Sequence, residues 1–139
     1  MAERFGFRLD RRTRPVLWVF GVRGVENAFV DLDDVTLDAT FGWAHVSVPL
    51  TNIVSWRIEG PWRSITAIGI RMSIRHRDIT FGGSARGGVR LDFRERVRLG
   101  PTRMPALYVT VDDLEGLAAA LKARGIAGVD ARVGRTPAP

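Results

Sequence analysis

The sequence contains no cysteine among its 139 residues, which excludes disulfides, thiolate zinc sites, iron–sulfur clusters and cysteine nucleophiles. It has only two histidines, His45 and His76, and neither belongs to an acid–histidine pattern of the kind that builds a hydrolytic triad or a metal site. We therefore predict no catalytic residue, no metal site and no cofactor, and we interpret both histidines as structural or surface residues. The protein is expected not to be an enzyme.

Long apolar runs are also lacking. No segment approaches the ~18 apolar residues that a membrane-spanning helix needs. The first residues, Met1–Phe5, include an acid and lack the apolar run of a signal peptide. We therefore expect an intracellular, cytoplasmic protein, for which peripheral association with a membrane stays open.

Lysine is nearly absent, because Lys122 is the only one among 21 basic residues and the net charge is +6. A preference for arginine, alanine, glycine and valine is typical of a GC-rich genome. The charges are nevertheless unevenly distributed. Residues 1–23 hold six arginines against two acids, residues 24–56 hold five acids and no base, and residues 57–103 hold eleven arginines against four acids. Either strands of opposite sign pair across a sheet, or a basic face binds an anionic partner.

The length suits one domain whose core needs no disulfide or metal. We expect residues 1–14 to be a weakly ordered segment and residues 15–127 to form a single β-rich domain. Residues 128–139 end in prolines and are expected to be a disordered tail.

Apolar runs and period-two alternation of apolar and polar residues predict about seven antiparallel strands. The glycine-rich segment 82–88 is predicted to be a hairpin connection, because a phosphate-binding loop needs a following helix and a lysine. Asp33 and Asp34, within the acidic cluster Asp31, Asp33, Asp34 and Asp38, are predicted to form a turn rather than a cation site. The predicted strand segments are 16–20, 28–32, 35–41, 43–48, 53–58, 70–81 (with a bulge near residue 77), 89–99 and 107–111.

One strong helix is predicted over residues 112–124. Asp112 is the expected N-cap, with Glu115 three residues later, and Gly125 ends the helix. Leucines at helical spacing form one apolar stripe. The predicted fold is mainly β with this one C-terminal helix: a pleckstrin-homology-like curved antiparallel sheet, or partly open barrel, capped by the helix.

Three segments carry a resemblance to a known family: 48–53 (VPLTNI), 87–95 (GGVRLDFRE) and 109–117 (VTVDDLEGL). On these residues the chain resembles an uncharacterised actinobacterial family of small proteins with a pleckstrin-homology-like fold. The resemblance spans about residues 15–126 and implies a fold, with no catalytic signature.

Arginines recur along the second basic block, and four of them alternate on one side of the predicted strand 89–99. Like charges on alternate positions repel unless acids or a ligand offset them. Glu95 falls on the opposite, apolar side, so we predict that an arginine of a neighbouring strand holds it. Trp62 and Arg63, after Gly60-Pro61, are a candidate exposed anchor. The candidate face for an anionic partner comprises Arg71, Arg75, Arg77, Arg86, Arg90, Arg94, Arg96 and Arg98.

These features favour a non-catalytic binding module that recruits a protein or peptide partner, or an anionic lipid surface, through the basic face. Nucleic-acid binding through the same face is an alternative with less support, since no known nucleic-acid-binding motif is present. A carrier of a small apolar ligand is another. A homodimer through an exposed strand edge also stays open.

Overall fold

The computed structural model describes residues 2–9, 14–60, 69–73, 78–82, 87–99 and 102–131. The described helices are α1 (Arg14–Val19) and α2 (Leu114–Ala123), with 3-10 turns η2 (Val25–Asn27) and η3 (Leu50–Asn52). The described strands are β1 (Glu3–Gly6), β2 (Ala28–Leu32), β3 (Thr36–Phe41), β4 (Ala44–Pro49), β5 (Ile53–Glu59), β6 (Gly69–Ser73), β7 (Asp78–Gly82), β8 (Gly88–Leu99), β9 (Thr102–Val109) and β10 (Gly128–Asp130).

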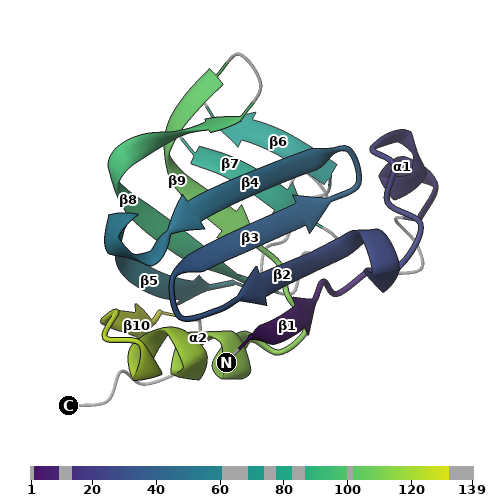
Figure 1. Ribbon diagram of the computed structural model, residues 1–139. Coiled ribbons are helices and arrows are strands. Elements are labelled where there is room, and N and C mark those ends of the chain that lie inside the picture. Colours follow the sequence, from purple (N-terminus) through teal and green to yellow (C-terminus); the bar gives the residue numbers. More distant parts are fainter. Residues whose placement is uncertain are drawn as a thin grey trace.

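The strands form two sheets, which confirms a mainly β architecture. One sheet has the order β1-β2-β3-β4 and the other β10-β5-β8-β9-β7-β6. Figure 1 shows the four-stranded sheet in front of the six-stranded one, with α2 below. The expected purely antiparallel arrangement is wrong in two places, because β7 pairs with β9 and β10 with β5 in parallel.

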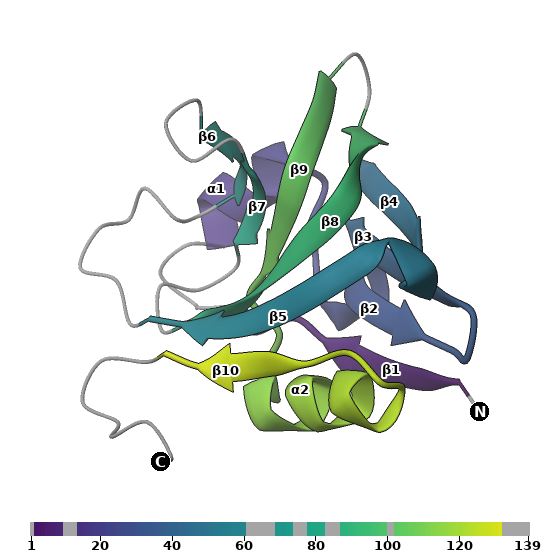
Figure 2. The ribbon, with the colours of Figure 1, turned by 90° about the vertical axis from the view of Figure 1, so that its left-hand side faces the viewer.

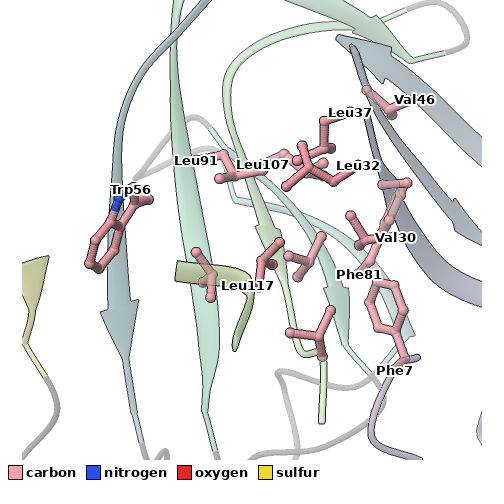
Figure 3. Packing of buried hydrophobic residues seen from close by; sticks show 14 of the residues in the cluster. Phe7, Val30, Leu32, Leu37, Val46, Trp56, Phe81, Leu91, Leu107 and Leu117 are labelled. Atoms are coloured by element: carbon pink, nitrogen blue, oxygen red, sulfur yellow. The ribbon is translucent and has the colours of Figure 1, made fainter. Parts of the chain in front are cut away.

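The hydrophobic core lies between the two sheets and extends to α2. Alternation along β2 and β3 sends every second side chain inward. The ring of Phe41 lies 4.9 Å from that of Phe7 and 5.7 Å from that of Phe81, measured between centroids. Figure 3 shows side chains of both sheets meeting in this cluster, together with Leu117 of α2. These ring contacts join Phe7, which follows β1, to Phe41 of the four-stranded sheet and Phe81 of the six-stranded sheet.

Helix α2 lies within the predicted range 112–124 and buries Leu114, Leu117 and Leu121. The predicted N-cap was wrong by one residue. Asp113, not Asp112, caps the helix, and its Oδ1 accepts a hydrogen bond from the N–H of Gly116 at 2.9 Å. None of the helices in the described part of the chain has both the length and the hydropathy to cross a membrane.

The predicted strand over 16–20 is instead helix α1. A short run in which every residue is apolar fits either structure, since it has no period to separate them. Pro15 suits a first helical turn, and in α1 only Leu17 of the apolar residues 16–19 is buried. The structure therefore uses one side chain of this run for the core and leaves three exposed.

The segment 70–81 was predicted as one strand and is two. β6 and β7 pair antiparallel, with Ser73 opposite Asp78. The glycine-rich segment that follows does join two strands, but it is not a hairpin connection, because β9 lies between β7 and β8 in the sheet. Strand order depends on long-range packing, which local alternation does not encode.

The two end segments that we expect to lie outside the β-rich domain both contain residues that the structure places in strands. Within the segment 1–14, β1 pairs with β2 and Phe7 is 2% exposed. Within the segment 128–139, β10 pairs with β5, with Gly128 opposite Trp56. The Trp56 indole leaves no room for a side chain at position 128. Residues 1, 10–13 and 132–139 lie outside the described residues.

Candidate binding surface

The structure brings only part of the predicted basic face together. Arg90, Arg94, Arg96 and Arg98 all lie on β8. Arg71 lies on β6, which is separated from β8 by β9 and β7. The remaining candidates lie outside the described residues: Arg75, Arg77 and Arg86, and the candidate anchor residues Trp62 and Arg63.

In the first half of β8 and the facing part of β5, each arginine pairs with an acid of its own strand. The Nε atom of Arg90 lies 3.1 Å from Oδ1 of Asp92, and the Arg90 side chain is 22% exposed. Arg90 stands opposite Arg57 of β5, whose Nη1 is 3.7 Å from Oε2 of Glu59. Two acids thus accompany these two arginines, so Arg90 is part of a paired cluster rather than of an open basic face.

The two N-terminal charge blocks also meet. Arg4 of β1 stands opposite Asp31 of β2, and its Nε and Nη2 donate to the carboxylate at 2.7 and 2.9 Å. This hydrogen bond raises the pKa of Arg4 above its ordinary value. This contact is a pairing of opposite charges on neighbouring strands, as one of the two interpretations of the charge blocks expects.

A bulge divides β8 between Asp92 and Val97. The side chain of Asn52 holds it: Nδ2 donates to the Glu95 carbonyl at 3.0 Å, and Oδ1 accepts from the Glu95 N–H at 2.8 Å. The prediction that an arginine holds the Glu95 side chain is wrong, because the bulge interrupts the alternation and turns that side chain to solvent. The alternation of side chains along β8 therefore predicts their orientation only as far as the bulge.

From the bulge onward, β8 and β9 carry a cluster of exposed arginines with Glu95 as the one acid between residues 93 and 104. Arg98 stands directly opposite Arg103, and like charges in that position destabilise a strand pair. Figure 2 shows this end of β8 and β9 projecting at the top, away from α2. We call the set the arginine hairpin; it comprises Arg94, Arg96, Arg98 and Arg103.

Arg103 was not among the predicted face residues, although it is the first arginine after the predicted strand. Its place opposite Arg98 depends on the register of the β8–β9 pair. That register depends on the bulge, which the sequence pattern does not predict.

The structure also exposes two tryptophans that lie in the predicted strand segments 16–20 and 43–48. Trp18 is 62% exposed and Trp43 is 74% exposed. Trp56 is buried, and its Nε1 donates to the Ile126 carbonyl at 2.8 Å. A signal for Trp43 was its place directly after Gly42, in the tight turn between two strands.

The acidic cluster is used in turns and ion pairs, as predicted for Asp33. Its carboxylate accepts hydrogen bonds from the N–H groups of Thr36 and Val35, each at 2.7 Å, and these bonds lower the pKa of Asp33. Asp38 lies 3.5 Å from Nε2 of the exposed His45. In the described part of the chain, no group of three or more His, Cys, Asp or Glu side chains is placed to hold a metal ion.

Comparisons of the chain with protein-family models, with curated protein sequences and with solved structures gave no match. The chemistry of the surface is therefore what indicates a function.

Proposed function

We propose that the protein is a non-catalytic binding module that associates with an anionic lipid surface through the arginine hairpin. The observation that carries the proposal is the hairpin's charge: four exposed arginines, two of them directly opposed, accompanied by one acid. Self-repulsion of this kind lowers stability. An anionic partner would add an attraction to these four exposed positive charges, which supports a role in binding.

A lipid surface suits this arrangement better than a specific pocket does. The arginines spread along a projecting hairpin, and anionic lipids attract such residues diffusely, with about 1 kcal/mol for each arginine near the surface. Helix α2 has Glu115 in its first turn and Lys122 in its last. It therefore lacks the basic face with which a helix enters a DNA groove.

We also propose that the fold is of the pleckstrin-homology-like kind. Two sheets accompanied by a late helix support this, whereas the parallel pairing of β10 with β5 departs from the purely antiparallel pattern expected. In that fold, headgroup-binding members carry basic residues between the first two strands of the domain. In this chain the segment between β1 and β2, residues 7–27, holds five arginines and includes the helix α1. We assign the contact to the arginine hairpin because all four of its arginines are exposed.

The test is co-sedimentation with neutral and with phosphatidylserine-containing vesicles across a salt series. Wild-type protein should bind only the anionic vesicles, and binding should fade as salt rises. The variant Arg96→Glu/Arg98→Glu should lose this binding. The matched control Arg57→Glu/Lys122→Glu has the same change in net charge on exposed residues far from the hairpin, and it should bind nearly as wild type does.

Equal losses in both variants would assign the binding to net charge and overturn the role of the hairpin. A DNA duplex titrated in the same salt series separates the main alternative. Binding of the duplex with no binding of vesicles would replace the lipid proposal with nucleic-acid binding. Binding of neither would leave a protein or peptide as the partner.

A further inference from the structure

A second surface, distinct from the arginine hairpin, exposes large apolar side chains. Val16, Trp18 and Val19 project from α1, and Trp43 projects from the turn between β3 and β4; their exposed fractions are 48%, 62%, 64% and 74%. Figure 1 shows α1 beside that turn. We call these four residues the tryptophan patch.

The backbone beneath the patch is firmly held. The N–H of Trp43 donates to the Phe20 carbonyl at 3.1 Å, and the N–H of Gly42 donates to the Asn27 carbonyl at 2.8 Å. The Trp43 indole lies so close to Gly21 that a side chain there would collide with it. These contacts fix Trp43 next to α1, so its exposure is a property of the folded structure and not of a loose turn.

Asn27 holds the other side of the patch. Its Nδ2 donates to the Gly21 carbonyl at 2.8 Å, while its Oδ1 accepts from the N–H groups of Arg23 at 3.0 Å and Gly24 at 3.3 Å. The guanidinium of Arg23 lies 5.7 Å from the centre of the Trp18 ring, within cation–π range. One side-chain amide thereby sets an exposed arginine against an exposed tryptophan.

The sequence around α1 is basic. Residues 8–23 hold five arginines against the single acid Asp10. Exposed tryptophan and valine, with Arg23 beside Trp18, match the chemistry of the bilayer interface, where indoles partition to headgroup level and arginines meet anionic lipids. We propose that the tryptophan patch inserts into the interface of an anionic bilayer.

The size of the patch favours a bilayer over a second protein surface. The two indoles together expose on the order of 300 Å² of aromatic surface. A stable protein–protein contact buries about 800 Å² on each partner. Insertion into a lipid interface has no such requirement, because shallow apolar contact and charge attraction act together.

The tryptophan patch and the arginine hairpin both lie on the part of the molecule away from α2 (Figures 1 and 2). One membrane surface could therefore meet both. The inference rests on the proposed function in its choice of a lipid surface as partner. It adds an apolar contact whose strength, unlike that of the hairpin, does not fall with salt.

The test uses brominated lipids, which quench tryptophan fluorescence only at close contact. Phosphatidylserine-containing vesicles with brominated chains should quench the wild-type protein and shift its emission to the blue. Trp18→Phe/Trp43→Phe should bind comparably but lose most of the quenching. Trp18→Ala/Trp43→Ala should bind about tenfold more weakly, because two apolar contacts are lost. The matched control Val54→Ala/Val129→Ala removes exposed apolar groups elsewhere and should bind as wild type does.

The outcomes that would contradict the tryptophan patch and those that would contradict the arginine hairpin can be told apart. Sedimentation with anionic vesicles without quenching would overturn the insertion of the patch and leave the hairpin proposal standing. Loss of binding in Trp18→Ala/Trp43→Ala together with full binding of Arg96→Glu/Arg98→Glu would overturn the hairpin and support the patch. If the wild-type protein self-associates and the double alanine variant is monomeric, with vesicle binding unchanged, the patch is an interface between copies of the chain.

Discussion

Individual side chains in this protein repeatedly terminate or connect elements through their own hydrogen bonds. Asp33 closes the turn between β2 and β3, Asn27 organises the segment after α1, Asn52 holds the bulge in β8, and Asp113 caps α2. Short polar side chains do this because they reach nearby N–H groups without leaving the backbone. The sequence shows which residues can act in this way. The capping pattern favours Asp112 as the N-cap of the helix, because two neighbouring aspartates cannot be distinguished as caps until the backbone path is known.

The turn at Asp33 predicts a specific dependence of stability on pH. The N–H groups of Thr36 and Val35 stabilise the carboxylate and lower the pKa of Asp33 from its ordinary value of 3.8. The unfolded state therefore binds this proton at a higher pH than the folded state. The contribution to stability is present above the ordinary pKa and is lost as pH falls through the lowered one.

Asp33→Asn separates the charge of this carboxylate from its shape. The amide oxygen can still accept hydrogen bonds but does not titrate. Urea unfolding should show wild type more stable than Asp33→Asn at neutral pH, with the difference closing as the solution is acidified below the ordinary pKa. A difference that stays constant over this range would assign the effect to geometry alone.

At the scale of elements, the sequence predicted best where one face of a strand is buried. Alternation placed β2, β3, β4 and β5 to within about two residues, the boundary precision expected of such patterns. It failed for α1, whose apolar run has no period, and for β6 and β7, which it merged into one strand. It also failed for the order of strands in the sheet, because pairing partners are distant in the chain. For the candidate site, the alternation identified Arg94, Arg96 and Arg98 but not the bulge that contains the first two of them.

The arginine hairpin allows stability and binding to be separated. Arg103→Glu replaces a like-charge pair opposite Arg98 with an opposite-charge pair, which should raise the free energy of unfolding by about 0.5 kcal/mol. The same change should weaken binding to anionic vesicles. Arg103→Gln removes the repulsion without adding attraction and should lie between. Thermal melts and vesicle co-sedimentation of the three proteins test this, and a parallel loss of stability and binding would contradict it.

The turn between β3 and β4 is a second element whose geometry can be tested. Gly42 has a φ of +60°, and a side chain there would collide with the Phe20 carbonyl. Gly42→Ala should therefore lower the free energy of unfolding by about 2 kcal/mol or more, from the backbone conformation and the collision together. Gly125→Ala is the matched control, since Gly125 has a φ of +85° but nothing within 4 Å of the added methyl group. A similar loss in both variants, measured by chemical denaturation, would show that the collision is relieved at little cost.

At the scale of the whole molecule, α2 and the segment after it join parts of the chain that are far apart in sequence. Leu117 and Leu121 reach the core between the sheets, and β10 adds a strand beside β5. The segment containing β10 was predicted to be disordered because three residues carry too little pattern to indicate a strand. What places it is Trp56, whose indole N–H binds the Ile126 carbonyl and whose ring leaves room only for glycine at position 128.

Arg124, at the end of α2, makes the connection that should matter most for the assembly of both N-terminal strands with the helix. Its side chain is 11% exposed. Nε donates to the Asp33 carbonyl at 2.9 Å, and Nη1 donates to Oε2 of Glu3 at 2.9 Å and to the Ala120 carbonyl at 3.0 Å. Removing the guanidinium leaves two carbonyls and a carboxylate without this donor. Arg124→Ala should therefore lower the free energy of unfolding by about 2 kcal/mol.

Lysine at position 124 keeps the charge but cannot form this branched set of bonds, so Arg124→Lys should recover less than half of the loss. Lys122→Ala, on the exposed side of the same helix, is the control and should change stability little. Urea unfolding measures all three. Full recovery by lysine would show that charge alone, rather than the connection among β1, the β2–β3 turn and α2, is what the arginine contributes.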